Sequence, residues 1–258
     1  MKKLMTHIVA GYPSLKKSEE LLRLMAKNGA DFIEIQIPFS DPVADGPTIM
    51  QANQKSLEAG TKVEDCFELM KKMTKIGSET KFLFMTYFNI LHHYGVEKFC
   101  SRAAKCGCYG LIVPDMPIDE EAQEHYLKNC RKHGLAPIQI ISPLTPERRL
   151  KMIAKVAAHP ARHGALASAE GFVYCVSRFG TTGQESKLNP QLSSYLKKVK
   201  KHIKVPLAVG FGISNKAHVE AVWKEADIAV VGSKIINILN ENSGDLKKLE
   251  EFVKGLKL

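Results

Sequence analysis

The sequence predicts an α/β fold, and within that class a single closed (β/α)8 barrel that spans residues 1–258. Two observations carry this prediction. Short apolar runs alternate with amphipathic segments along the chain, and such alternation requires parallel strands joined by right-handed crossovers. The chain also has 258 residues, close to the roughly 250 of one closed barrel. We therefore expect one domain.

The elements follow in order from this alternation. Each expected strand is a short apolar run, and the segment after it has the spacing of an amphipathic helix. Helix starts agree with the pattern, because Ser14, Thr145 and Ser214 are suitable N-cap residues and Pro146 suits a first helical position. The eight strands are expected near residues 6–11, 31–37, 81–86, 109–113, 136–141, 171–176, 205–209 and 227–231.

Residues 158–169, AHPARHGALASA, differ in composition from the rest of the chain. They contain no lysine and no isoleucine, although both are frequent elsewhere. The segment falls between the fifth helix and the sixth strand, away from the carboxyl ends of the strands, where a long connection is tolerated and non-catalytic. We interpret it as an inserted loop, and its composition fits a mobile loop and an artificial segment equally well.

The chain is basic, with 37 lysines and arginines against 27 acidic residues and a formal net charge of +10. The lysines are scattered over the helical segments, and no basic stripe is interleaved with aromatic residues. This favours a solvated surface that also attracts an anionic substrate over a protein that binds nucleic acid.

Other features argue against membrane and metal-binding classes. The longest apolar runs, such as residues 228–232, are far shorter than the roughly 20 residues of a membrane-spanning helix, and the first residues lead into no signal-peptide core. The cysteines show no CxxC or Cys/His metal spacing, so we expect reduced structural thiols, no metal site and a cytoplasmic protein. They are Cys66, Cys100, Cys106, Cys108, Cys130 and Cys175.

A carboxylate interrupts the apolar strand in residues 32–47, FIEIQIPFSDPVADGP. Alternation along a strand places the isoleucines at positions 33, 35 and 37 toward the helices and Glu34 toward the barrel interior. A buried carboxylate is costly unless it is hydrogen-bonded or used in chemistry. A structural Glu tied to a polar neighbour remains an alternative, but the loop that follows favours a catalytic role.

That loop carries two more carboxylates. Prolines stiffen it and Gly46 permits a sharp turn after Asp45, so Asp45 is expected to be a second positioned carboxylate. Asp41, beside Pro42 near the middle of the loop, suits either a cap of backbone amides or contact with a partner.

Glycine-bearing turns follow the sixth, seventh and eighth strands at residues 180–183, 210–214 and 232–233. In barrels, the loops after the last two strands and a helix N-terminus often bind an anion, so a phosphate site is expected here. Apolar residues at strand ends either pack in the core or form a slot for a flat ring. They are Tyr87, Ile140, Tyr174 and Phe211.

The segment FIEIQIPFSDPVADGPTI, together with MTYFN (residues 85–89), VSRFGTTG (176–183) and VGFGIS (209–214), closely resembles the family of tryptophan synthase alpha subunits. The similarity runs in order over nearly the whole chain. It implies a TIM barrel that cleaves indole-3-glycerol phosphate to indole and glyceraldehyde 3-phosphate in tryptophan biosynthesis, without a cofactor. It also implies a pyridoxal-phosphate beta subunit as partner, in a heterotetramer of two alpha and two beta subunits.

The resemblance assigns roles to single residues. Glu34 matches the family's general acid/base, and Asp45 matches its second carboxylate, which we expect to be kept ionised by a solvated loop. Asp41 and Pro42 match a segment at the beta-subunit interface. Thr182 matches the residue that closes a loop over the site. Phosphate contacts are implied for Gly183, Gly212, Gly232 and Ser233, and ring-pocket positions for Tyr87, Ile140, Tyr174 and Phe211.

The chain also departs from the family's pattern. It begins almost directly with the first strand, without the usual N-terminal extra helix. Gln36 stands where the family usually has glycine and is expected to crowd the substrate or misplace Glu34, unless it points aside. His7 replaces an apolar residue at the pocket edge, and Lys234 replaces a small one. These departures keep two alternatives open, a stand-alone lyase and a weakly active or inactive alpha-like subunit that activates a beta subunit.

Overall fold

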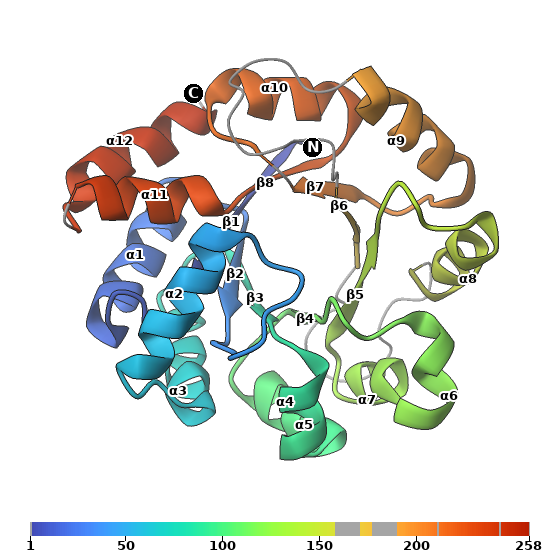
Figure 1. The fold of residues 1–258 in the computed structure, drawn as a ribbon, viewed down its shortest axis with the longest axis horizontal. Coiled ribbons are helices and arrows are strands. Elements are labelled where there is room, and N and C mark those ends of the chain that lie inside the picture. The colour runs from blue at the N-terminus through green and yellow to red at the C-terminus, as the bar shows by residue number, and fades with distance from the viewer. Residues whose placement is uncertain (1, 158–170, 177–189, 211, 243, 258) are drawn as a thin grey trace.

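Eight parallel strands close into a barrel in the computed structural model, each strand paired with the next in the chain and β8 with β1. Figure 1 shows the helices as a ring around these strands. The structure describes residues 2–157, 171–176, 190–210, 212–242 and 244–257. The strands are β1 Lys3–Val9, β2 Phe32–Gln36, β3 Lys81–Met85, β4 Gly110–Ile112, β5 Ala136–Ile141, β6 Val173–Val176, β7 Leu207–Gly210 and β8 Ile228–Val231.

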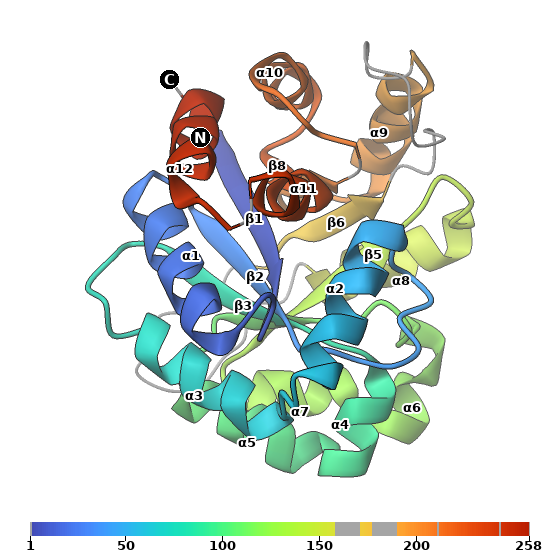
Figure 2. The same cartoon turned by 60° about the vertical axis from the view of Figure 1, so that its left-hand side comes forward.

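The prediction of a (β/α)8 TIM barrel is therefore confirmed. Several crossovers contain two helices, as between β2 and β3, and Figure 2 shows α2 beside α11 at one end of the barrel. The helices are α1 Leu15–Lys27, α2 Pro47–Glu58, α3 Val63–Met73, α4 Phe88–Tyr94, α5 Val96–Lys105, α6 Glu121–Glu124, α7 Tyr126–Lys132, α8 Glu147–Ala157, α9 Pro190–His202, α10 Lys216–Glu225, α11 Ser233–Glu241 and α12 Leu246–Lys257, with a 3-10 turn at Ile118–Glu120.

The predicted insertion at residues 158–169 lies outside the described residues. Its flanks are α8 and β6, which agrees with its expected place in the chain order. Of the N-cap predictions, Ser14 is confirmed, because its side chain accepts a hydrogen bond from the Lys17 amide. Ser214 is wrong by one residue: Asn215 caps α10, because its Oδ1 accepts from the His218 amide at 2.9 Å.

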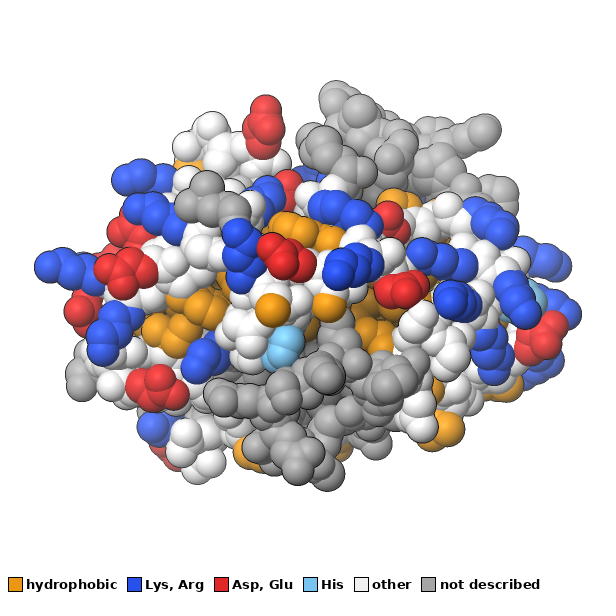
Figure 3. Space-filling model, turned by 90° about the horizontal axis from the view of Figure 1, so that it is seen from above, with side chains coloured by type: hydrophobic (Ala, Val, Ile, Leu, Met, Phe, Trp, Pro, Cys, Tyr) orange, Lys and Arg blue, Asp and Glu red, His pale blue; other side chains and the backbone are white. Residues whose placement is uncertain are grey.

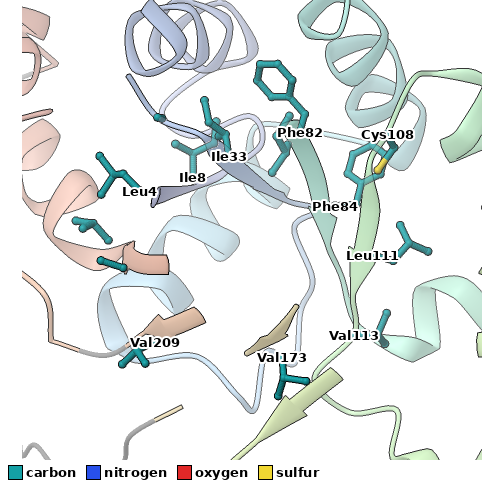
Figure 4. Packing of buried hydrophobic residues seen from close by; sticks show 14 of the residues in the cluster. Leu4, Ile8, Ile33, Phe82, Phe84, Cys108, Leu111, Val113, Val173 and Val209 are labelled. Carbon is teal, nitrogen blue, oxygen red and sulfur yellow. The ribbon is translucent and has the colours of Figure 1, made fainter. Parts of the chain in front are cut away.

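The larger core cluster lies between the strands and the helices. Its members come from alternate strand positions, such as Leu4, Ile8, Ile33 and Phe84, all 0–1% exposed. Figure 4 shows these side chains projecting from the strands toward the surrounding helices. Apolar burial of this extent supplies the main favourable term in folding.

The remaining strand positions face the barrel interior, where the floor is closed by aromatic rings. Phe32 packs against Phe172 and Tyr109, with ring centroids 5.3 and 5.8 Å apart. The ammonium groups of Lys3 and Lys81 lie 5.2 and 5.9 Å from the centre of the Phe32 ring, within cation–π range. The first strand starts at Lys3, earlier than the predicted residue 6, because its first four residues pair with β8.

The face in Figure 3 carries interspersed basic and acidic side chains. This agrees with the expectation of a solvated, mixed surface rather than a basic stripe. Among the described residues, no helix is both long enough and apolar enough to cross a membrane.

A substitution at Gly110 tests how tightly β4 packs against β5. A Cβ atom there would overlap the backbone oxygen of Ala136, which cannot swing away as a side chain can. We expect Gly110→Ala to lower the free energy of unfolding by about 1–3 kcal/mol, measured by urea denaturation. Gly255→Ala is the matched control, because no atom lies within 4 Å of the added carbon. It should raise stability by about 0.5–1 kcal/mol, since glycine weakens a helix. Equal changes in the free energy of unfolding for the two variants would contradict the close packing at Gly110.

Candidate active site

Glu34 lies in the middle of β2, opposite His7 on β1 and Leu83 on β3. It points into the barrel, as predicted, and is only 3% exposed. Its Oε2 atom is 2.8 Å from Nδ1 of His7. Its Oε1 atom is buried and has no hydrogen-bond partner among the described residues. One oxygen of the carboxyl group is thus fixed and the other is available.

His7 is itself buried, at 7% exposure. Burial lowers the pKa of its imidazole, but the hydrogen bond to Glu34, the charges of Glu34 and Asp45 and the amide of Gln36 outweigh burial. The net effect raises the pKa of His7 above its ordinary value. The imidazolium form is therefore retained to higher pH than in a free histidine.

Gln36 contacts Asp45 rather than Glu34. Its Nε2 atom donates to Oδ2 of Asp45 at 2.6 Å and lies 3.4 Å from Oδ1 of Asn53. The structure therefore places the amide of Gln36 on the second carboxylate. That Gln36 crowds the substrate stays a prediction.

The loop around Asp45 is exposed at Ala44 and Gly46, as expected, but Asp45 itself is less solvated than we predicted. Asp45 is partly buried, and burial raises the pKa of its carboxyl group. Hydrogen bonds from Gln36 and Tyr87 and the charge of His7 oppose that rise, because they favour the ionised form. Both donors reach Oδ2, the Tyr87 hydroxyl at 3.1 Å.

The loop between β2 and α2, visible in Figure 1, is fastened at two further points. The Tyr87 hydroxyl accepts from the Ala44 amide at 3.1 Å, and its ring stacks on Phe39 with centroids 5.1 Å apart. Oδ1 of the fully buried Asn53 accepts from the Phe39 amide at 3.0 Å. Sequence reasoning missed Asn53 and Phe39. The available signal for Asn53 was a polar residue on the same face of α2 as Ile49 and Ala52, at the spacing of the buried stripe.

The predicted ring-pocket residues divide into three groups. Ile140 and Tyr174 are partly buried and pack against the interior cluster, so they face the barrel space. Tyr87 is 1% exposed and its hydroxyl is engaged by the loop, so it contacts the interior mainly through its ring. Burial is the largest cause that raises the pKa of Tyr174, and the charges of Glu34 and Asp45 add to the rise. Phe211 lies outside the described residues.

The predicted phosphate region is described only in part. Thr182 and Gly183 lie outside the described residues. Gly232 is the N-cap of α11 and Ser233 its first residue, and no side chain caps this helix. Amides at such an N-terminus are suited to an anion. Gly212 is exposed and has a φ of +66°, a conformation that favours glycine. Lys234 is partly buried beside them.

Asp41 and Pro42 lie on the outer side of the loop. Asp41 is exposed, and its Oδ2 accepts from the Ser40 hydroxyl at 2.5 Å. Pro42 is buried within the chain but borders a surface groove of about 560 Å³ between the loop and α2. Met50 and Leu57, 45% and 37% exposed, also line it. Neither Glu34 nor Asp45 borders this groove, so it is separate from the carboxylate site.

Metal ligation is not supported within the described part of the chain, where no group of three His, Cys, Asp or Glu side chains is placed to hold an ion. The cysteines are all buried and unpaired by disulfides.

Comparison with known proteins decides the family. Residues 1–257 match the family model described as "Tryptophan synthase alpha chain". The chain belongs to the tryptophan synthase alpha chain family. It is 46% identical over 254 residues to the tryptophan synthase alpha chain of Syntrophotalea carbinolica, covering 98% of this chain and 94% of that one. With that of Methanocaldococcus jannaschii the identity is 41%, over 95% and 83% of the two chains.

Solved structures agree. A mutant tryptophan synthase alpha-subunit from the hyperthermophile Pyrococcus furiosus superposes with a TM-score of 0.85 at 30% identity, covering 98% of this chain and 97% of that one. A tryptophan synthase from Mycobacterium tuberculosis gives 0.84 at 29% identity, over 99% and 91%. Two contacts in the structure were not part of the site that the sequence predicted. They are the hydrogen bonds of His7 with Glu34 and of Gln36 with Asp45.

Tyr87→Phe tests the charge state of Asp45. The Tyr87 hydrogen bond lowers the pKa of Asp45, so its loss should raise that pKa further. As pH falls, the ionised form is then lost at higher pH, and the acidic limb of kcat/KM should move upward. The measurement is a pH–rate profile of the lyase reaction proposed below. Tyr94→Phe, which removes a hydroxyl bonded to the surface residue Glu64, is the matched control. If the acidic limb of kcat/KM does not move in Tyr87→Phe, the role of Tyr87 in setting the pKa of Asp45 is wrong.

Proposed function

We propose that this chain cleaves indole-3-glycerol phosphate to indole and glyceraldehyde 3-phosphate as the alpha subunit of tryptophan synthase. One observation carries the proposal: β2 holds two carboxyl groups in different environments. Glu34 of β2 is buried in the barrel with Oε1 unpaired among the described residues, and Gln36 of the same strand donates to Asp45 of the following loop at 2.6 Å. Distinct environments allow two carboxyl groups to take distinct chemical roles.

Glu34 is proposed as the general acid and base. Breaking the bond between indole C3 and the glycerol carbon requires a proton on C3, and Oε1 is the oxygen free to deliver it. The bond's electrons return to the ring as the glycerol hydroxyl becomes the aldehyde. The hydroxyl proton then passes to the carboxylate, so Glu34 ends the cycle in its starting form.

Asp45 is proposed to stabilise the charge that develops at the indole nitrogen. Its Oδ2 atom is held by Gln36 and Tyr87, and no hydrogen bond from the described residues reaches Oδ1. Oδ1 would accept the ring N–H, and a carboxylate fixed before the reaction stabilises positive charge without reorganisation. Ile140 and Tyr174 would flank the ring.

The phosphate is proposed to bind at the N-terminus of α11. The uncapped amides around Gly232 and Ser233, with Gly212 nearby in the chain's seventh loop, supply donors and the positive end of the helix dipole. Thr182 and Gly183 stay predictions from the resemblance. No cofactor is needed, because the carboxyl groups perform each proton transfer.

The partner is proposed to be a beta subunit that takes up the indole, in an assembly of two alpha and two beta subunits. The exposed Asp41 and the groove beside Pro42 support contact there, since exposed apolar side chains beside a loop are typical of an interface. A cytoplasmic location suits six buried free thiols.

A second function is favoured by a specific observation. Glu34 and Asp45 are both engaged by side chains of the chain itself, His7 and Gln36, which suits a weakly active alpha-like subunit that mainly activates its partner. A stand-alone lyase is the third alternative. Steady-state indole formation with and without a beta subunit separates all three.

Glu34→Gln is expected to abolish indole release while the fold is preserved, because the amide is nearly isosteric but transfers no proton. The loss of kcat should be about 100-fold or more. Indole formation is measured alongside the melting temperature. Glu64→Gln is the control, since Glu64 is an exposed partner of Arg102. Near-normal turnover in the folded variant would remove Glu34 from the mechanism.

Asp41→Ala tests the proposed interface. If the beta subunit favours the ordered loop, it raises activity through its differential affinity for that state, and such coupling is typically about 5–150-fold. The variant should lose stimulation by the beta subunit more than basal cleavage. Indole formation is measured over a titration of beta subunit. Equal proportional losses at zero and saturating partner would rule out this loop as the coupling element.

A further inference from the structure

The pair formed by His7 and Glu34 is more than a way to bury a carboxylate. Nδ1 of His7 holds Oε2 of Glu34 at 2.8 Å, and both side chains are less than 10% exposed. We propose that His7 is a positioning residue for Glu34, which aims Oε1 at the reacting carbon and stabilises the carboxylate formed when its proton leaves. This inference rests on the proposed lyase function.

The geometry fixes the carboxyl group in one orientation. A glutamate side chain rotates freely about its last bonds unless an oxygen is held, and a charge-assisted hydrogen bond is about twice as strong as a neutral one. Because Oε2 is bonded to His7, Oε1 is the oxygen that remains, and it is buried without a partner among the described residues. A buried unpaired oxygen calls for an explanation, and the proposed substrate would supply the missing partner of Oε1.

The charge around His7 supports an imidazolium in this position. The charged groups that act on it are Glu34 on β2 and Asp45 on the loop, both acidic. On the β8 side the neighbour is Gly232, which brings no charge; a Cβ built on it would lie 3.6 Å from that of His7. Lys3, on the same strand, sits at the floor over the ring of Phe32. These acidic neighbours raise the pKa of His7 despite its burial.

The chemistry balances within the pair. Glu34 enters the step after Oε1 has taken a proton from solvent. Oε1–H gives this proton to indole C3, and the imidazolium of His7 stabilises the carboxylate that remains through Oε2. The bond between C3 and the glycerol carbon then breaks toward the ring. Oε1 takes the hydroxyl proton, the aldehyde forms, and both members of the pair regain their initial protonation.

Two variants of His7 separate position from charge. His7→Phe keeps a ring but removes the donor, and kcat should fall about tenfold or more with little change in KM, as for a lost hydrogen bond to a charged group. His7→Asn restores a donor near the Nδ1 position without the positive charge, so its kcat should lie between that of His7→Phe and that of the wild type. His93→Phe and His93→Asn, at an exposed position on α4, are the matched controls.

The pH profile gives a readout that a structural role would not move. As pH rises through the raised pKa of His7, the imidazolium is lost and the activity of the wild type should fall. That basic limb should be absent or displaced in His7→Asn. Unchanged profiles and an unchanged kcat in folded His7→Phe would overturn the inference, while indole formation by the wild type would leave the proposed function standing.

A measurement without activity tests the pair directly. The imidazole signal of His7 is followed by NMR over a pH titration in wild type and in Glu34→Gln. Without the carboxylate, burial is the largest remaining influence, so the pKa of His7 should drop. If the wild type releases no indole but this drop is seen, the proposed function fails and the pair stands. No change in the His7 titration would overturn the pairing itself.

A double-variant cycle tests whether Gln36 belongs to the same unit. Nε2 of His7 and Oε1 of Gln36 are both buried without a hydrogen bond of good geometry, and the Gln36 amide favours the charged form of His7. We expect Gln36→Gly and His7→Phe to be non-additive in kcat, with the double variant losing less than the product of the two losses. Strict additivity would confine the inference to His7 and Glu34.

Discussion

The burial of Glu34 is the constraint on which the rest of the site depends. A carboxylate inside a closed barrel is strongly disfavoured unless a charge or hydrogen bond compensates it, and Glu34 is 3% exposed. His7 supplies that compensation and becomes positively polarised in turn. The imidazole then favours the ionised form of Asp45. One buried charge thus organises two further groups before any substrate binds.

The second carboxylate is positioned by the same polar network but from outside the sheet. Asp45 belongs to a loop, and loops are held only by the contacts they make. Gln36 at the end of β2 and Tyr87 after β3 both donate to it, while Asn53 of α2 binds the Phe39 amide. The loop is therefore fastened to two strands and one helix. Its charged group acquires the precision of the barrel, which catalysis requires.

The barrel and the direction of Glu34 were predictable from the sequence because both depend on local periodicity. Alternation in β2 places Ile33 and Glu34 on opposite faces whatever the rest of the chain does. The burial of Asp45 and the anchoring by Asn53 were not predictable, because they depend on contacts between segments distant in sequence. The start of β1 was missed for the same reason, because residues 3–6 form a strand by pairing with β8, which lies near the other end of the sequence.

The barrel interior separates stability from chemistry along its axis. At the floor, aromatic rings and lysines close the space through contacts that need no unpaired polar atom. Toward the other end, Glu34, His7 and Gln36 each carry a buried polar atom without a partner among the described residues, which costs folding free energy. Such a cost persists where the surrounding core can bear it. The apolar layer between strands and helices supplies the folding free energy that offsets this cost. The polar end can therefore keep unpaired atoms that a ligand would contact.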